Sequence, residues 1–157
     1  EVFHSLWQIA RLQLALNKDP DTIIDGFYTA YAYRPSRAEP LCDLAKYYRS
    51  RNEFEKAYRV ASIGMTIPPS GDILFVEQSP YEYDLQLECS VAAYWMGDYE
   101  KCQQLSLALL QKKDLPPHIR SLVEANLAFS NAKLVEQVRY DTELKSEKGE
   151  LAGSSSK

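Results

Sequence analysis

Residues 36–69 read SRAEPLCDLAKYYRSRNEFEKAYRVASIGMTIPP, in which two amphipathic segments are joined by a short polar turn and closed by prolines. Pro35 and Pro69 lie 34 residues apart, and each follows such a pair of segments. Apolar and small residues recur at identical spacing before each proline. They are Trp7, Ala10, Leu14, Ile23, Phe27 and Ala30 before Pro35, and Leu41, Leu44, Tyr48, Ala57, Ala61 and Gly64 before Pro69. A period of this length is typical of stacked helix-turn-helix repeats.

The first two repeats, 3–35 and 36–69, each contain signals for the start of a helix. The periodicity predicts helices over 3–17, from Pro20 to the end of the first repeat, from Ser36 onward, and over 53–66. Asp19 is expected to cap the second helix, with Pro20 at its first position. Ser36 is expected to cap the third, with Glu39 as its capping-box partner.

The segment 70–80, SGDILFVEQSP, interrupts the period. The pentapeptides EFEKA (53–57) and DYEKC (98–102) align at a shift of 45 residues rather than 34, which indicates an insert here. Because four successive residues, Ile73 to Val76, are apolar, the insert is expected to pack back onto the helices.

A third, looser repeat is predicted over 81–115, with helices near 81–96 and 98–112. A seventh helix over 117–139 would cap the exposed end of the stack. Residues 140–157 are polar and are expected to be a tail, disordered or appended to the native chain.

The spacing of residues 3–113 resembles that of the tetratricopeptide superfamily. This resemblance implies an all-α fold: a right-handed superhelical stack of about three such helical hairpins with a C-terminal capping helix. Residues 1–139 would form one α-solenoid domain.

A narrower resemblance is carried by RPSRAEPLCDLAKYYRSRNEFEKAY (34–58) and ILFVEQSPYEYDLQLECSVAAYWMGDYEKC (73–102). Both are similar to the helical repeat region beside family 2-type glycosyltransferase domains in bacterial and large-virus proteins. In that family a separate α/β domain transfers the sugar, and no alternating strand-helix pattern supplies one here. The resemblance therefore implies a non-catalytic accessory or acceptor-recruiting module. The alternative is a free-standing protein-interaction scaffold with a peptide in its concave groove.

Composition narrows the classes of partner and of chemistry. A net charge of −4 and a pI near 5.3 disfavour nucleic acid, and no apolar run is long enough for membrane insertion. Three widely spaced cysteines favour reduced thiols and a cytoplasmic location. Asp19-Pro20-Asp21 matches the metal-binding Asp-x-Asp of glycosyltransferases only superficially, because it lies between two helices. No catalytic residue, metal site or cofactor is predicted, so this chain is not expected to be an enzyme.

The predicted binding residues fall into two groups. Arg37 and Arg49 could form an anion-facing stripe on one helix, or could be solvated charges paired with nearby carboxylates. Lys46 and Arg49 occupy expected concave positions. Aromatic residues of the third repeat could form a platform for a sugar ring or a peptide side chain, with Glu77 or Asp84 accepting hydrogen bonds. The platform candidates are Tyr81, Tyr83, Tyr94 and Trp95, which cluster with Tyr99 around the third repeat. The expected partner is thus a protein, a peptide or a glycan acceptor, and the apolar stripe of 119–139 is wide enough to allow self-association.

Overall fold

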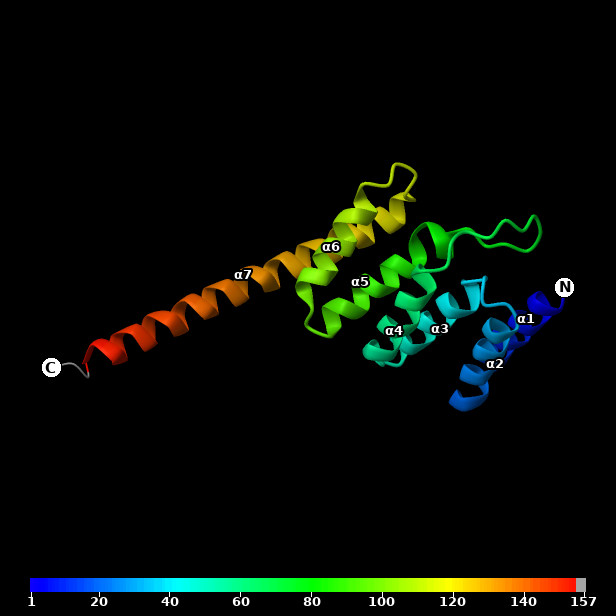
Figure 1. The fold of residues 1–157 in the computed structure, drawn as a ribbon, viewed down its shortest axis with the longest axis horizontal. Coiled ribbons are helices and arrows are strands. Elements are labelled where there is room, and N and C mark those ends of the chain that lie inside the picture. Colours follow the sequence, from blue (N-terminus) through cyan, green and yellow to red (C-terminus); the bar gives the residue numbers. More distant parts are fainter. Residues whose placement is uncertain (155–157) are drawn as a thin grey trace.

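The computed structural model describes residues 1–154, which form seven α-helices and no strand (Figure 1). The all-α prediction is therefore confirmed for these residues. The helices are α1 (Val2–Ala15), α2 (Pro20–Tyr33), α3 (Glu39–Ser50), α4 (Phe54–Met65), α5 (Leu85–Trp95), α6 (Tyr99–Leu110) and α7 (Pro117–Ser154). A π-helical turn, η1 (Pro80–Asp84), leads directly into α5.

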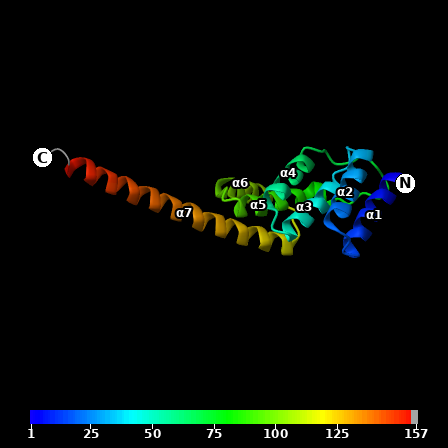
Figure 2. The same cartoon turned by 90° about the horizontal axis from the view of Figure 1, so that it is seen from below.

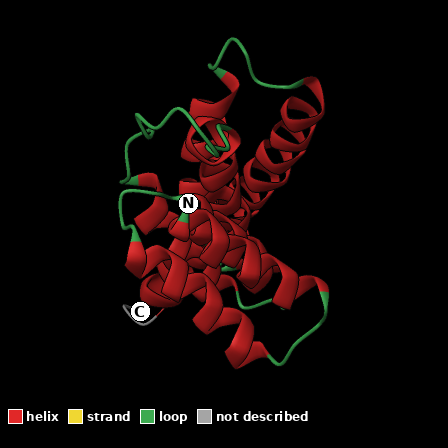
Figure 3. Ribbon diagram, turned by 90° about the vertical axis from the view of Figure 1, so that its right-hand side faces the viewer, coloured by secondary structure: helices red, strands yellow, loops and turns green. Residues whose placement is uncertain are grey.

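Each helix packs mainly against its neighbours in sequence, and α5 also contacts α3 and α7. The first six helices follow one another from the N-terminus toward the middle of the molecule, joined by short connections except for the long loop before η1 (Figure 1). Seen from below, α7 leaves this body as a single rod (Figure 2). An end-on view shows the connecting loops at the edges of the packed helices (Figure 3).

The turns α1–α2, α3–α4 and α5–α6 share one geometry. Each contains a residue with a left-handed backbone: Asn17 (φ 48°), Asn52 (φ 59°) and Gly97 (φ 84°). In each turn, the next residue's N–H donates to the carbonyl five positions earlier. These bonds are Lys18 to Gln13 (3.0 Å), Glu53 to Tyr48 (2.9 Å) and Asp98 to Ala93 (2.9 Å). This is the Schellman closure of a helix, and it requires a residue that tolerates positive φ.

Small residues lie where the helices touch. Ala10 and Ala30 are fully buried in the first hairpin, as are Ala57 and Ala61 in α4. At Gly64 a β-carbon would lie only 2.7 Å from a methyl group of Leu85, so glycine permits the close approach of α4 to α5. The main core runs from α1 to α6, and a smaller cluster joins α5, α6 and α7.

The two predicted helix caps have opposite outcomes. The Asp19 carboxylate accepts from the N–H of Thr22 at 2.9 Å, which confirms it as the cap of α2, and the hydroxyl and N–H of Thr22 lower the pKa of Asp19. The capping box of Ser36 and Glu39 is wrong. Helix α3 begins at Glu39 without a side-chain cap, because the Glu39 carboxylate is buried against Arg37 instead.

The loop 66–79 packs back onto the first hairpin, through three contacts. They are Arg34 to Asp72 (2.7 Å), Arg11 to Glu77 (2.9 Å) and His4 to Phe75 (ring centroids 4.4 Å apart). Ile73 and Leu74 remain 95% and 68% exposed. Charged groups and one aromatic ring therefore hold the middle of the loop, where Ile73 and Leu74 contribute little burial, whereas Ile67 at its start packs against the main core.

Helix α7 is longer than predicted. It continues from Pro117 to Ser154, so neither a helix end near 139 nor a disordered tail from 140 is observed; residues 155–157 lie outside the described part. The sequence 118–148 contains no proline or glycine, and ion pairs at helical spacing, such as Lys133 to Glu136, support the exposed rod. Within residues 1–154, no helix combines the length and the apolarity needed to cross a membrane.

Candidate binding surface

Five aromatic side chains from four helices meet at one end of α5. Phe54 begins α4, Tyr94 and Trp95 end α5, Tyr99 begins α6, and Phe129 lies on α7. We refer to these five residues as the aromatic surface.

Trp95 is the most exposed member of the aromatic surface, at 62%. Its indole stacks on Phe54 with ring centroids 5.5 Å apart and planes 14° from parallel. The ring of Tyr94 is perpendicular to that of Trp95, with centroids 5.5 Å apart, and its centroid lies 5.4 Å from that of Tyr99 and 6.3 Å from that of Phe129. Phe54 stacks on one face of the indole, and more than half of the Trp95 surface nevertheless remains accessible to a ligand. Phe129 is itself 59% exposed.

The structure adds Phe54 and Phe129 to the aromatic cluster that the sequence predicts, and a signal for Phe54 exists in the sequence. Phe54 and Tyr99 occupy equivalent positions in the pentapeptides EFEKA and DYEKC. Each is therefore the first residue of the returning helix of its hairpin and lies beside the last turn of α5. The internal alignment therefore relates Phe54 to Tyr99 of the predicted cluster, whereas the sequence pattern indicates for Phe129 only a place on the apolar face of the seventh helix.

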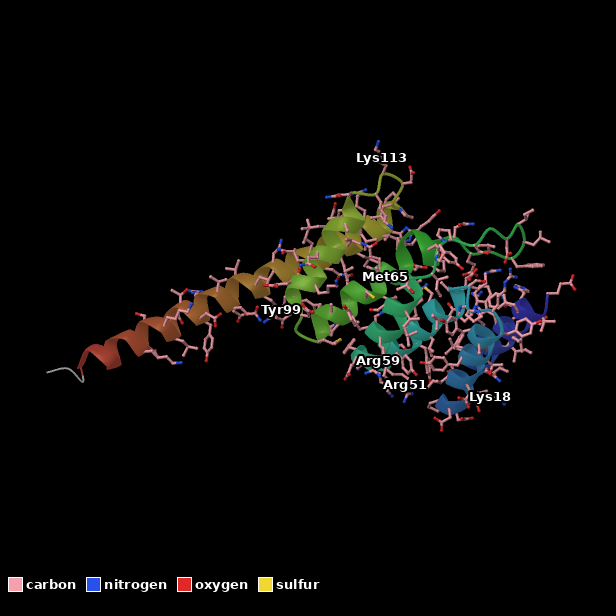
Figure 4. The ribbon with its side chains drawn as sticks, in the orientation of Figure 1. Lys18, Arg51, Arg59, Met65, Tyr99 and Lys113 are labelled. Carbon is pink, nitrogen blue, oxygen red and sulfur yellow. The ribbon has the colours of Figure 1, made fainter. Side chains whose placement is uncertain are left out.

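A hollow of about 650 Å³ adjoins the aromatic surface where α7 leaves the helical body. It is lined by Tyr99, Lys133, Glu136, Gln137, Tyr140 and Asp141. Tyr99 belongs to both features, and Figure 4 places it at this junction, far from Lys113 on the loop between α6 and α7. We refer to this feature as the α6–α7 hollow.

The cations at the predicted concave positions are neutralised by the following hairpin. Lys46 bonds to Asp84 at 2.9 Å, and Arg49 bonds to Glu88 at 2.6 Å. Ser79 donates a further hydrogen bond to Asp84 at 2.8 Å. These groups join α3 to η1 and α5, so they are not free to hold an anionic ligand.

Arg37 is buried, with 2% of its side chain exposed, and lies before α3 rather than on it. Its guanidinium bonds to the carboxylate of Glu39, to Asp72 at 2.9 Å and to the carbonyl of Phe75 at 2.5 Å. It also lies over the ring of Phe3, 4.7 Å from the centroid. Since Arg37 is enclosed and Arg49 is at the far end of α3, the predicted anion-facing stripe does not form.

Tyr81 belongs to the same buried network. Its hydroxyl donates to Glu39 at 2.7 Å and accepts from the N–H of Ala38 at 3.0 Å. Burial, together with the hydrogen bond to Glu39, raises the pKa of Tyr81 to about 12. This tyrosine therefore holds η1 against the start of α3 and does not contribute to the aromatic surface.

The two carboxylates proposed to assist the platform lie elsewhere. Glu77 pairs with Arg11, and Asp84 pairs with Lys46 at the start of α5. Trp95 is at the other end of that helix, about 16 Å away by the rise per residue. Tyr83 is also distant from the aromatic surface and lines a separate hollow of about 260 Å³ with residues 112–115. Of the nine predicted binding residues, the structure brings only Tyr94 and Trp95 together at this surface.

The described residues contain no group of three His, Cys, Asp or Glu side chains that could hold a metal ion. Cys42, Cys89 and Cys102 are buried and unpaired, and burial raises the pKa of each thiol. A raised pKa keeps these groups in the unreactive thiol form at neutral pH.

No family model matches this chain, and no curated protein sequence matches it either. The fold and surface define a helical protein with an exposed aromatic surface formed by neighbouring hairpins. Its function is therefore inferred from the chemistry of that surface.

Proposed function

We propose that this chain is a non-catalytic, tetratricopeptide-like binding module whose ligand lies on the aromatic surface. The observation that carries the proposal is the geometry of Trp95, which is stacked on Phe54 by one face and 62% exposed. An indole held in this way is preorganised, so a ligand need not offset the cost of ordering it. Exposed aromatic clusters of this kind are characteristic of binding sites.

The ligand we favour is a glycan acceptor, presented to a sugar-transferring domain of a larger cytoplasmic protein. Two independent points support it. The stretches 34–58 and 73–102 resemble the repeat region that accompanies family 2-type glycosyltransferases. The flat, apolar face of an indole also suits the C–H face of a pyranose ring, whose hydroxyl groups then point outward to polar partners.

The alternative, a scaffold that holds a peptide in its concave groove, has less support. The predicted concave residues Lys46 and Arg49 bond to Asp84 and Glu88. A peptide that used these cations would first have to displace partly buried carboxylates, which costs more than binding to free side chains. Whether the ligand is a glycan or a peptide, we propose that the hairpins stack as a right-handed superhelix.

Trp95 also supplies the test. The chain has two tryptophans, and the other, Trp7, is 1% exposed and donates to Asp43 at 2.8 Å. A change in the emission of exposed indole during an oligosaccharide titration therefore reports on Trp95. Trp95→Ala should weaken glycan binding by about tenfold, measured by calorimetry, because the stacking face is lost.

The matched control is Tyr33→Ala, which removes a 57% exposed aromatic residue from α2. It should leave affinity unchanged, and circular dichroism should show that both variants remain folded. Unchanged glycan affinity in folded Trp95→Ala would contradict the proposal. Binding of peptides alone, sensitive to Lys46→Ala, would instead support the scaffold.

A further inference from the structure

One face of α7 continues the aromatic surface along the rod. Phe129, Lys133, Glu136 and Tyr140 are separated by four, three and four residues, so they lie on the same side of the helix. Eleven residues of helix span about 16 Å, several times the width of one pyranose ring. Phe129 lies in the aromatic surface, and Tyr140 lines the α6–α7 hollow.

The two features are also joined through Tyr99. This residue contacts Tyr94 at 5.4 Å within the aromatic surface and lines the hollow together with Lys133 and Tyr140. A ligand that extends from Trp95 past Tyr99 therefore reaches the hollow without leaving the surface.

The lining of the α6–α7 hollow restricts the chemistry of its occupant. Lys133 bonds to Glu136 at 3.0 Å, and Asp141 adds a second carboxylate, so the formal charge of the lining is −1. A net negative lining disfavours phosphates and other anions. Gln137 and the two phenols supply further donors and acceptors, which disfavour a purely apolar ligand. Mixed donors and acceptors between two aromatic rings match a neutral, hydroxyl-rich chain.

We propose that the α6–α7 hollow is a second subsite for a neutral linear oligosaccharide. One sugar unit stacks on Trp95, and the following units run along α7 to Tyr140. Lys133, Glu136 and Gln137 bond to their hydroxyl groups. This inference rests on the proposed glycan function and adds the extended form of the ligand and its direction along α7.

The test is the dependence of affinity on ligand length. Calorimetry with neutral β-linked glucose and N-acetylglucosamine oligosaccharides should show affinity rising by about tenfold from the disaccharide to chains long enough to reach the hollow. Tyr140→Ala should remove most of that gain while leaving the affinity for the disaccharide within about twofold of wild type. Tyr140 is 61% exposed, so the variant is expected to fold normally.

Val138→Ala is the matched control. Val138 is 67% exposed on the same rod. It follows Phe129 by nine residues, or about two and a half helical turns, so it lies on the opposite side of α7. It should not alter the dependence on length. Affinity that does not rise with length, or an equal loss with Val138→Ala, would overturn the second subsite while leaving binding at Trp95 intact. Failure of every oligosaccharide to bind, or binding of basic peptides in the hollow instead, would overturn the glycan function as well.

Discussion

Arg37 and Asp72 determine where the loop 66–79 lies. Arg37 is enclosed by Glu39, Asp72 and the carbonyl of Phe75, and Asp72 also pairs with Arg34 at the end of the first hairpin. Phe75 has a positive φ of 58°, an unfavourable conformation for a residue with a side chain. The bond from Arg37 to its carbonyl helps to hold this backbone in place.

The contribution of Asp72 to stability should depend on pH. Partial burial acts to raise its pKa, but hydrogen bonds from Arg37 and Ser70 hold the pKa of Asp72 below its ordinary value of 3.8. Its pairs therefore stabilise the folded state fully above about pH 4, and this stability is lost as the pH falls through the lower pKa of the folded state. The free energies of unfolding of wild type and Asp72→Asn, measured with urea, should differ near neutral pH and converge in stronger acid.

Asp25→Asn, a change at an exposed position of α2, is the control for the loss of one negative charge. It should not reproduce the pH-dependent difference. If the free energies of unfolding of wild type and Asp72→Asn differed by the same amount down to the most acidic pH, the charge of the Asp72 carboxylate would not be what anchors the loop.

The ion-pair partners of the arginines are the feature of the structure that is hardest to predict from the sequence. One of the two alternatives for Arg37 and Arg49 is pairing with carboxylates near in sequence, and Glu39 is indeed one partner of Arg37. The remaining partners, Asp72 for Arg37 and Glu88 for Arg49, lie 35 and 39 residues further along the chain. Only the packing of one hairpin on the next brings them together, and the periodicity of a single helix carries no information about it.

At the scale of elements, the hairpin turns have a clear signal in the sequence. Asn17, Asn52 and Gly97 are residue types that tolerate a left-handed backbone, and each follows an apolar helical pattern. The first six helices could therefore be located from the sequence. The end of the seventh could not: no helix-breaking residue follows position 139 before Gly149, but the polar composition of this segment is also typical of a disordered tail, so the pattern does not decide between the two.

Gly97 offers a direct test of this turn. A β-carbon there would meet no atom within 4 Å, so the effect of substitution is conformational rather than steric. Gly97→Ala should lower the free energy of unfolding by about 1 kcal/mol, because alanine is strained at positive φ. Thermal and urea unfolding would measure the loss.

Gly97→Asn is the control that the chain itself suggests, since asparagine occupies the equivalent position in the other two turns. Gly97→Asn should lower the free energy of unfolding clearly less than Gly97→Ala does. Equal losses for both substitutions would show that backbone conformation is not the reason for glycine at this position.

At the scale of the whole molecule, α7 divides into a packed half and a projecting half. Ile119, Val123 and Ser130 are buried against the body, whereas Val135 and Val138 are more than two-thirds exposed. Most of the stability of a helix in a protein comes from the packing of its apolar face, which the projecting half lacks. The projecting half therefore depends on its own ion pairs, such as Lys133 to Glu136, and on continuity with the packed half.

Deleting residues 143–157 should leave the thermal midpoint of the body unchanged within error. Far-ultraviolet circular dichroism should lose only the contribution of the removed turns, because the described side chains of this segment make no contact with the core clusters. The deletion retains Tyr140 and Asp141, so the α6–α7 hollow is kept. A lowered midpoint would show that these turns stabilise the body.

The packing of each helix on its neighbours in sequence also has a kinetic consequence. Contacts between segments close in the chain require little loop closure, and proteins dominated by such contacts fold rapidly. Each hairpin can form around its own left-handed turn and then add to the next. The slowest step is expected to be the docking of the loop 66–79, since its ionic contacts join groups up to 66 residues apart.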